Sequence, residues 1–437
     1  MIILLKIVDV CTRVEGHGNV KILVKNDEIS SVDFEIGSNR GFESILIGKK
    51  LNDIPKIVSR ICGLCYASQT IASCKAIENL FEIAVPEQSI LLRYLLLFGE
   101  LIKSHSMHFF FQSLPDLFQI FQVSQKPFSP YELIRYDSQL TTKVYELIKI
   151  GNEIETIFGG RSVHLISPIP GGLIYLPSRK NISIARKYFQ KAIINLEWIM
   201  EKFIDLFSNH APPKEFDLPE VMYMGLNNFG NFDRYKGTLN IKENERNSIE
   251  FEEKNYSSYF EKDINIRGFD FHFDKSKRFL VGPISRYKIT ENYEIDKINT
   301  YLEYFNKSWQ NGVLFANFLR LLEMYFESHQ GLKILEEPAL NRRILLPSLT
   351  SLKNSEGIGV IEAPRGMLLH HYYVNDNSVI KKAKILIPTE INILLINDMI
   401  TKYAQELYNK TGDLNLVKKK IQTVIRAFDP CISCVVH

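Results

Sequence analysis

Apolar and polar residues alternate in short runs at the start of the chain, and helical spacing replaces this pattern further on. Three β-rich runs, 4–10, 20–24 and 29–34, lie on either side of the turn signal Asn26-Asp27 and predict a small antiparallel sheet within residues 1–36. Between residues 53 and 207 the apolar positions mostly recur at helical intervals. The segments with this spacing are 71–81, 87–112, 131–158 and 182–207. Residues 53–207 are therefore predicted to be helical.

The second half of the chain begins with a different pattern. Residues 208–290 combine Pro212-Pro213 and several glycines with many charges, which indicates an irregular insert with short strands. Helical spacing returns in three segments, 295–328, 390–410 and 414–428. Proline disfavours helix at the residue before it, so Asp429-Pro430 should end the last helix and place the final cysteines on a turn. With no repeat or flexible linker, residues 1–437 are expected to form a single interwoven unit of the α+β class, predominantly α-helical.

Composition narrows the class of protein. The chain has 437 residues, of which 45% are hydrophobic and 24% charged, as is typical of a soluble globular protein with a large core. The net charge of +3 and the lack of a basic cluster disfavour nucleic-acid binding. The most apolar stretch, 89–111, contains Arg93, Glu100 and Lys103, so we expect a buried helix and no direct membrane span. The first residues lack the features of a signal peptide, and we expect a cytoplasmic protein.

Candidate chemistry is concentrated in two Cys-x-x-Cys pairs at opposite ends of the chain, Cys62/Cys65 and Cys431/Cys434. Thiolates grouped in this way bind zinc, copper(I), iron-sulfur clusters or another thiophilic metal. The ligands of a local zinc finger lie within a few tens of residues, so a site shared by both pairs must be made by the whole fold. The spacing alone leaves a structural zinc site open. The other cysteines, Cys11 and Cys74, are expected to be small buried hydrophobes.

The residues around the two pairs resemble the signatures of the large subunit of nickel-iron hydrogenases. They read Arg60-Ile61-Cys62-Gly63-Leu64-Cys65 and Asp429-Pro430-Cys431-Ile432-Ser433-Cys434. Further matches occur in order at Arg13-Val14-Glu15-Gly16-His17-Gly18, Arg40-Gly41-Phe42-Glu43, Ser104-His105-Ser106-Met107-His108, Gly159-Gly160-Arg161, Glu362-Ala363-Pro364-Arg365-Gly366 and Pro388-Thr389. The resemblance implies that family's fold, a long-helix bundle with small peripheral β-sheets, and its activity, the reversible heterolytic cleavage of dihydrogen.

The resemblance also implies roles for the four cysteines. Cys62 and Cys431 would be terminal thiolates on nickel, and Cys65 and Cys434 would bridge nickel to an iron that carries carbon monoxide and two cyanides. Heterolytic cleavage needs a metal to accept the hydride and a base to accept the proton. By resemblance Cys431 is the first proton acceptor and Glu15 is the next. A helix cap or salt-bridge partner is the alternative role for Glu15.

Further residues are assigned by the same resemblance. Arg365 would reach over the open metal position and bind a cyanide nitrogen, with Asp116 and Asp429 as neighbouring carboxylates. A cap of a helix or turn is the alternative for Asp429. Thr389, which follows Pro388, would donate its hydroxyl to the second cyanide, because a diatomic acceptor in a dry pocket needs a donor. We expect the histidines of these motifs to be structural: His105, His108, His17, His370 and His371. A metal-binding pair is the alternative for His105 and His108.

Two features concern the ends of the match. Glu43 and the terminal His437 resemble the ligands of a second metal site, for Mg²⁺ or Fe²⁺, with a backbone carbonyl near Leu386; a disordered tail is the alternative for His437. In the family a protease removes an extension after this histidine, so we expect either a mature chain or one encoded without an extension. Gln69 stands where the family has a histidine that hydrogen-bonds a cysteine sulfur. An amide can still donate a hydrogen bond, but it cannot be protonated.

Electrons are expected to leave through a partner, because the chain lacks a Gly-x-Gly-x-x-Gly fingerprint and further clustered cysteines. By resemblance that partner is an iron-sulfur small subunit, followed by other electron-transfer subunits with iron-sulfur clusters or flavin. A maturation chaperone and protease would act on a chain made with an extension. The segment 281–286 and the modest length are most like the cytoplasmic multimeric branch. Two alternatives are a hydrogen-sensing homologue with little turnover and a non-catalytic thiolate-metal subunit of an electron-transfer complex.

Overall fold

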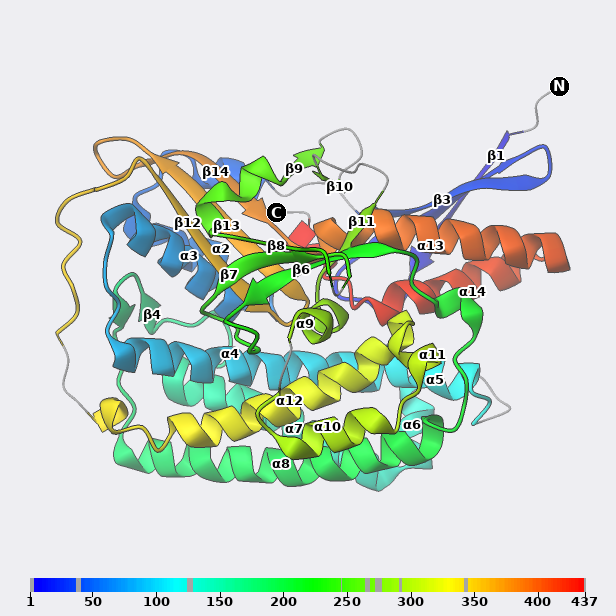
Figure 1. The fold of residues 1–437 in the computed structure, drawn as a ribbon, viewed down its shortest axis with the longest axis horizontal. Coiled ribbons are helices and arrows are strands. Elements are labelled where there is room, and N and C mark those ends of the chain that lie inside the picture. The colour runs from blue at the N-terminus through cyan, green and yellow to red at the C-terminus, as the bar shows by residue number, and fades with distance from the viewer. Residues whose placement is uncertain are drawn as a thin grey trace.

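Long helices form one half of the molecule in the computed structural model, as Figure 1 shows. The structure describes residues 4–36, 41–123, 129–244, 246–263, 268–271, 277–290, 293–341 and 345–435. The longest helices of this half are α4 (Glu87–Met107), α7 (Ser138–Gly159), α8 (Arg179–Phe207) and α12 (Ala316–Ile334). Helices α4 and α7 cross closely where Gly99 faces Gly151, since a Cβ on Gly151 would lie 2.6 Å from the Gly99 carbonyl oxygen. These helices make up the predicted bundle.

Small sheets and further helices form the other half. Strands β1 (Leu4–Cys11), β2 (Gly18–Lys25) and β3 (Glu28–Ile36) make an antiparallel sheet, as the sequence predicted. Helix α13 (Pro388–Thr411) lies along β3, where Thr401 and Asn397 accept hydrogen bonds from the backbone N–H groups of Val32 and Phe34. The predicted fold class, helical with small peripheral sheets, is confirmed.

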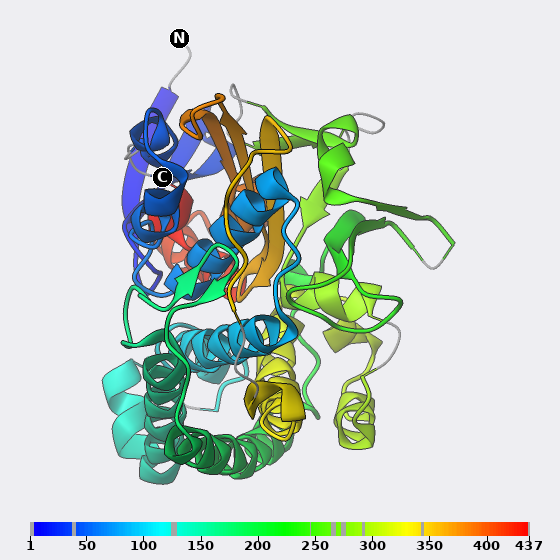
Figure 2. The same ribbon diagram turned by 90° about the vertical axis from the view of Figure 1, so that its left-hand side faces the viewer.

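A second antiparallel sheet lies beneath helix α3 (Tyr66–Phe81) and was not predicted. Its strands are β12 (Glu356–Ala363), β13 (Gly366–Val374) and β14 (Ile380–Leu386). Figure 2 shows α3 lying against this sheet. The helix touches the strand backbone directly, because a Cβ on Gly359 would lie 2.3 Å from the Ala72 carbonyl oxygen. This packing fixes the position of the Cys62/Cys65 pair, since Cys65 is the N-cap of α3.

Shorter elements complete the fold. The remaining helices are α1 (Phe42–Leu46), α2 (Ile54–Val58), α5 (Leu114–Ile120), α6 (Pro130–Tyr136), α9 (Pro283–Ile289), α10 (Asp296–Glu303), α11 (Lys307–Gln310), α14 (Leu414–Ala427) and α15 (Ile432–Val435). The 3₁₀ turns are η1 (Leu51–Asp53), η3 (Lys214–Phe216), η4 (Glu253–Ser258), η5 (Val313–Phe315) and η6 (Pro338–Asn341), and η2 (His108–Ser113) is a π-helical turn between α4 and α5. The remaining strands are β4 (Pro168–Ile169), β5 (Gly172–Leu173), β6 (Val221–Asn227), β7 (Thr238–Lys242), β8 (Ser248–Phe251), β9 (Phe260–Asp263), β10 (Gly268–Phe271) and β11 (Arg278–Leu280). Among the described residues, every helix is too short or too polar to cross a membrane.

Three predicted boundaries were wrong. The segment 295–328 is not one helix but α10, α11, η5 and α12, because Asn306 caps α11 and Gly312 is extended (φ −112°, ψ 151°). The segment 131–158 is divided at Asp137, which is extended and accepts a hydrogen bond from Leu140 N as the N-cap of α7. Cys434 does not lie on a turn but in the short helix α15.

Two segments near opposite ends of the chain meet beside the cysteines. Glu15 and Cys431 form a parallel β-bridge, and Ile432 N donates a hydrogen bond to the Glu15 carbonyl oxygen (3.0 Å). The sequence required such a meeting if the two cysteine pairs were to share one site.

Candidate metal centre

All four paired cysteines converge at the junction of the two halves. Cys62 and Cys65 precede α3, and Cys431 and Cys434 follow α14. The four cysteine sulfur atoms all lie within 4.8 Å of one another, and all four side chains are buried. The sulfur atoms of Cys62 and Cys431 are 3.4 Å apart, and those of Cys65 and Cys434 are 3.0 Å apart. The expected pairing of the chain ends into one thiol cluster is therefore present.

Burial and proximity set the protonation of these thiols. Hydrogen bonds from neighbouring thiols, that of Cys431 first, hold the pKa of Cys62 well below its usual range. Burial, reinforced by hydrogen bonds, raises the pKa of Cys431 well above its usual range. Several thiols this close together cannot all lose their protons unless a positive charge compensates the negative charges. A bound metal supplies that charge. Four soft donors from opposite ends of the chain fit a thiophilic metal such as nickel.

Glu15 contacts the cluster on one side. The Cys431 thiol donates to Glu15 Oε2 (3.1 Å), which also accepts a hydrogen bond from Ser433 N (3.1 Å). The Ser433 hydroxyl donates to Glu15 Oε1. Gly16 has a positive φ of 86°, and a Cβ there would lie 3.0 Å from Ser433 N, so a glycine is needed beside this carboxylate. Glu15 is thus within reach of a proton on the Cys431 sulfur.

Arg365 contacts the cluster from another element, the turn between β12 and β13. Its Nη2 lies 2.9 Å from Asp429 Oδ1, and its Nε donates to the Asp429 carbonyl oxygen (2.8 Å). Burial opposes the charge on Arg365, but Asp429 and then Cys431 hold the pKa of the guanidinium well above its usual range. Burial likewise works against an ionised Asp429, yet Arg365 keeps the pKa of that carboxyl below its usual range. The pair is ionised beside the thiols.

Asp116 lies elsewhere in this region. It is in the first turn of α5, just after the π-helical turn η2, and its carboxylate forms ion pairs with Arg13 and Arg426. The Arg426 guanidinium also donates to the Thr12 carbonyl oxygen (3.0 Å). Asp116 therefore joins the segment before Glu15 to helix α14.

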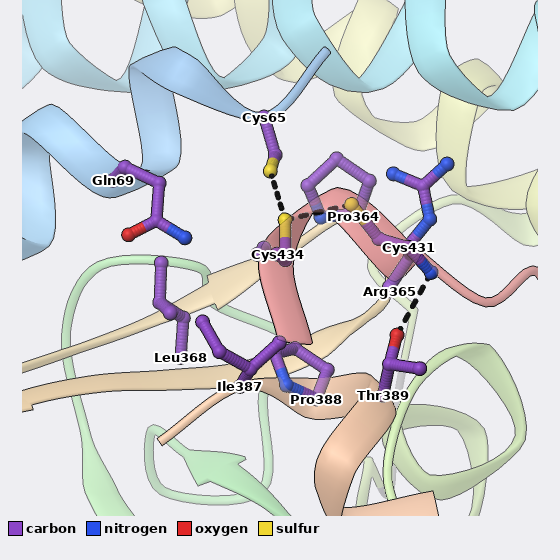
Figure 3. Close-up of a pocket in the computed structure, with 11 residues that line it drawn as sticks. Cys65, Gln69, Pro364, Arg365, Leu368, Ile387, Pro388, Thr389, Cys431 and Cys434 are labelled. Carbon is purple, nitrogen blue, oxygen red and sulfur yellow. Dashed lines mark hydrogen bonds between the residues drawn. The ribbon is translucent and has the colours of Figure 1, made fainter. Parts of the chain in front are cut away.

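A small cavity adjoins the sulfur atoms of Cys65, Cys431 and Cys434 (Figure 3). Most of its wall is apolar or lacks charge, and its lining residues include Ala363, Pro364, Arg365, Leu368, Ile387, Pro388, Thr389 and Gln69. Thr389 Oγ1 accepts a hydrogen bond from Cys431 N (2.9 Å), so its hydroxyl hydrogen remains available to a ligand. Gln69, Arg365 and Thr389 bring hydrogen-bond donors to this cavity beside the thiol cluster, which fits a metal that carries small acceptor ligands.

Comparisons with known proteins agree with this geometry. Residues 40–143 and 280–437 match the family described as nickel-dependent hydrogenase. The sulfhydrogenase 2 subunit alpha of Pyrococcus furiosus is 30% identical over 434 residues, which cover 98% of each chain. The chain belongs to the nickel-dependent hydrogenase family. It is a large subunit of the nickel-iron type and an oxidoreductase acting on dihydrogen, as the sequence motifs predicted.

Two further hydrogenases are similar to this chain over nearly its whole length. The beta subunit of the NAD-reducing hydrogenase HoxS of Cupriavidus necator is 25% identical over 465 residues, covering 99% of this chain and 94% of the relative. The crystal structure of an NAD⁺-reducing [NiFe]-hydrogenase in the H₂-reduced state matches with a TM-score of 0.91 and 25% identity, covering 100% of this chain and 99% of that chain. All three named relatives are hydrogenases or subunits of hydrogenases.

The second metal site expected in this hydrogenase is described only in part. Glu43 lies in α1, and its Oε1 accepts a hydrogen bond from Ile385 N (2.7 Å), next to Leu386 on β14. His437 lies outside the described residues. The expectation of a magnesium or iron site at these residues stays a prediction.

The histidines of the hydrogenase motifs are mostly held by protein partners. His105 Nε2 lies 3.1 Å from Glu323 Oε2, and His108 Nε2 donates to the Arg426 carbonyl oxygen (2.8 Å). Burial lowers the pKa of His105 to about 4 and that of His108 to about 3, so both are neutral near pH 7. Cys11 and Cys74 are buried, as expected.

The partner of Gln69 cannot be recognised from the sequence. The amide oxygen of Gln69 lies 2.8 Å from His370 Nε2, although the two residues are far apart in the sequence. The sequence predicts a structural role for His370 and indicates no partner for it. The double-histidine run in the sequence gave no signal for this contact, because β13 was not predicted.

Proposed function

We propose that this chain is the catalytic subunit of a hydrogenase that cleaves dihydrogen reversibly and heterolytically at a nickel-iron centre with one carbon monoxide and two cyanide ligands. Cys62 and Cys431 would be terminal ligands of nickel, and Cys65 and Cys434 would bridge nickel and iron. The observation that carries this proposal is the contact between Cys431 Sγ and Glu15 Oε2, which joins a proton acceptor to a four-thiol metal site. When bound, the centre supplies an acceptor for the electron pair of dihydrogen.

Proton transfer falls to the chain's own residues. Cys431 receives the proton at its sulfur and passes it to Glu15 Oε2 across 3.1 Å. Ser433 N and the Ser433 hydroxyl hold the carboxylate in place while its charge changes. Glu15 thus acts as the first relay group, and the alternative reading of Glu15 as a cap does not account for its bond to a metal-ligand thiol.

Binding of the diatomic ligands falls to Arg365 and Thr389. The Arg365 guanidinium carries several donors, and its bonds to Asp429 leave others free to serve a cyanide nitrogen. The Thr389 hydroxyl, at the start of α13 beside Pro388, serves the second cyanide. Asp116 supports this arrangement by holding Arg13 and Arg426 near Glu15 and Asp429.

Electrons would leave through an iron-sulfur small subunit, in a cytoplasmic complex with further iron-sulfur or flavin subunits. Two of the relatives named above are subunits, and two are named NAD-reducing hydrogenases, which supports partners that serve soluble electron carriers. Exposed apolar side chains next to the Cys62 loop offer a docking surface: Val163, Ile166, Ile174 and Leu176. His164 Nδ1 ties this surface to the loop by donating to the Ser59 carbonyl oxygen (2.7 Å).

A magnesium or iron ion at Glu43, Leu386 and His437 would hold the C-terminal end. A maturation chaperone and protease would act if an extension is made.

An infrared spectrum of the anaerobically purified complex tests the proposal. One carbon monoxide band and two cyanide bands that shift under dihydrogen are expected. Stoichiometric zinc without such bands would overturn the proposal in favour of a structural thiolate-metal site. Bands that shift without hydrogen-dependent dye reduction would favour a hydrogen sensor.

Cys431→Ala tests the metal assignment separately. The variant loses a terminal ligand and the first proton acceptor, so nickel content and dye reduction should both be abolished. Cys74→Ala is the matched control, because Cys74 is a buried thiol outside the cluster. Nickel and activity retained in Cys431→Ala would remove this cysteine from the ligand set.

A further inference from the structure

Four polar side chains link helix α3 to strand β13 within the buried contact between them. Gln69 and Ser73 are four residues apart on one face of α3, and His370 and Tyr372 are two residues apart on one face of β13. His370 Nε2 lies 2.8 Å from Gln69 Oε1, and His370 Nδ1 lies 2.6 Å from the Tyr372 hydroxyl. With the ring proton on Nε2, Nδ1 accepts from the Tyr372 hydroxyl, whose oxygen lies 3.0 Å from Ser73 Oγ and accepts from the Ser73 hydroxyl. The links close a loop between helix and strand.

This loop fixes which way the Gln69 amide faces. An amide oxygen only accepts hydrogen bonds, so a proton on His370 Nε2 must be the donor in their contact. Because the amide oxygen of Gln69 accepts from His370, the NH₂ group of the same amide points away from His370. Gln69 lines the cavity beside Cys65 and Cys434, and Figure 3 shows the amide nitrogen on the side of Gln69 that faces Cys434.

We propose that His370 is a positioning residue that holds the Gln69 amide so that its N–H group donates toward the sulfurs of Cys65 and Cys434. This inference rests on the proposed function, in which these two thiolates bridge nickel and iron. A donor at the bridging sulfurs withdraws electron density from them. Glu15 is an acceptor beside Cys431, on the terminal side of the cluster. The chain therefore offers a donor to the bridging thiolates and a base to one terminal thiolate, which directs the proton of dihydrogen toward Cys431 and Glu15.

A purely structural clamp between α3 and β13 would use the same four residues, so the test needs a readout that such a clamp does not change. Carbon monoxide and cyanide stretching bands report the electron density at the iron. Gln69→Glu keeps the oxygen that accepts from His370 and removes the N–H donor. Both kinds of band should then move to lower wavenumber, because the bridging sulfurs keep more electron density.

Variants of His370 test the positioning role. His370→Leu should split or broaden the same bands, because the freed amide adopts two orientations. His370→Gln keeps a donor at the place of Nε2 and should restore one set of bands near the wild-type positions. Thr70→Ala is the matched control, since Thr70 neighbours Gln69 but its hydroxyl donates to the Tyr66 carbonyl oxygen of its own helix. Bands at wild-type positions in both Gln69→Glu and His370→Leu would overturn the inference.

A second measurement does not depend on metal. Thermal unfolding of the purified complex with Gln69→Met, His370→Leu and the double variant measures their coupling. The double variant should lose less stability than the two single losses combined, because either substitution alone breaks the contact. Additive losses would overturn the contact on which the inference rests. If the wild-type protein shows no carbon monoxide or cyanide bands, the proposed function fails, and this cycle alone decides whether His370 holds Gln69.

Discussion

Cys431 is held at three points by residues from the other end of the chain and from α13. Thr389 accepts from its backbone N–H, Glu15 accepts from its thiol, and its backbone pairs with that of Glu15. Two of these contacts fix the backbone of Cys431, and the third fixes the direction of its thiol. At this scale the chemistry depends on whether Glu15 can take up a proton.

Glu15→Gln separates proton uptake from structure. The amide oxygen can still accept the bond from Ser433 N, but the side chain cannot carry a proton away. We expect nickel, iron and the infrared bands to be retained, while hydrogen-deuterium exchange activity falls by about 10²- to 10⁴-fold, the usual contribution of a positioned acid-base group. Gas-phase mass spectrometry of isotope exchange measures the effect.

Glu35→Gln serves as the control, because Glu35 forms a partly exposed ion pair with Lys21 on the N-terminal sheet. Exchange rates of Glu15→Gln within twofold of the wild type would show that protons leave by another route.

The sequence motifs located most of these residues, and the reason for the exceptions is physical. Cysteine pairs, the Pro-Arg-Gly turn and Pro388-Thr389 are local patterns, so they can be recognised without knowledge of the fold. The Gln69–His370 contact joins a helix to a strand, and only the packing of α3 on the sheet brings the two side chains together. Asp429 took a positive φ of 55° that allows its carbonyl and carboxylate to face Arg365 together, and no sequence pattern signals this.

Helix α3 is positioned by two glycines of strand β12, Gly357 and Gly359. A Cβ on Gly359 would lie 2.3 Å from the Ala72 carbonyl oxygen and 2.4 Å from Ala76 N. Both contacts are to backbone, which cannot move aside as a flexible side chain can. The distance between α3 and the sheet is therefore set by the absence of a side chain.

Gly359→Ala should push α3 away from the sheet. We expect a loss of stability of about 1–3 kcal/mol, the usual range for overpacking. Nickel content should also fall, because Cys65 is the N-cap of the displaced helix. Thermal unfolding and metal analysis of the same preparation measure both effects. Gly312→Ala is the control, since Gly312 is also extended but its nearest neighbour would be 3.3 Å from the new Cβ; equal losses in the two variants would argue against this role of Gly359.

Elements with a polar face could be predicted, and those buried on both faces could not. Helix α8 alternates buried and exposed positions at helical spacing, so its range was recovered almost fully. Strands β12 and β13 are buried along nearly their whole length, so they lack the alternation that indicates a strand. Helix breaks at Asn306 and Asp137 depend on single capping residues within apolar periodic sequence, and periodicity alone does not detect them.

The free energy of unfolding of the whole molecule should depend on pH, because histidines are buried in its interior. Burial holds the pKa of His108 at about 3 and that of His105 at about 4, below the ordinary value of 6.5. Below pH 6.5 the unfolded chain binds protons that the folded chain does not, so the free energy of unfolding falls as the pH falls through this window. Each histidine should cost about 2 kcal/mol of stability at pH 5 relative to pH 8.

His108→Gln should remove one such contribution. Glutamine can still donate to the Arg426 carbonyl oxygen, and it does not titrate. The difference in unfolding free energy between pH 8 and pH 5 should shrink by about 2 kcal/mol in this variant. Denaturant unfolding at the two pH values measures it, with the exposed His210→Gln as control. An unchanged difference would mean that His108 is protonated in the folded protein at pH 5.

A metal bound to the four cysteines would close a long loop of the chain, because its ligands come from segments that are far apart in the sequence. The single interwoven unit predicted from the sequence implies that metal binding at this junction stabilises both end segments together. Cys431 N and Ser433 N are already bonded to Thr389 and Glu15, so their protection depends on how firmly the C-terminal segment is held. Four metal-sulfur bonds would hold it more firmly than thiol hydrogen bonds do.

Hydrogen-deuterium exchange of protein purified with and without nickel in the growth medium tests this coupling. Amides in residues 429–435 and 13–16 should exchange at least about tenfold slower in the nickel-loaded protein, a factor that corresponds to about 1.4 kcal/mol of local stabilisation. Peptides from α8 should exchange equally in both, because that helix lies in the helical half and carries none of the cysteines. Slower exchange of 429–435 alone would show that the C-terminal segment is held by the metal independently of Glu15 and its neighbours. Equal exchange of both segments would show that the protein fold alone, without metal, holds the two chain ends together.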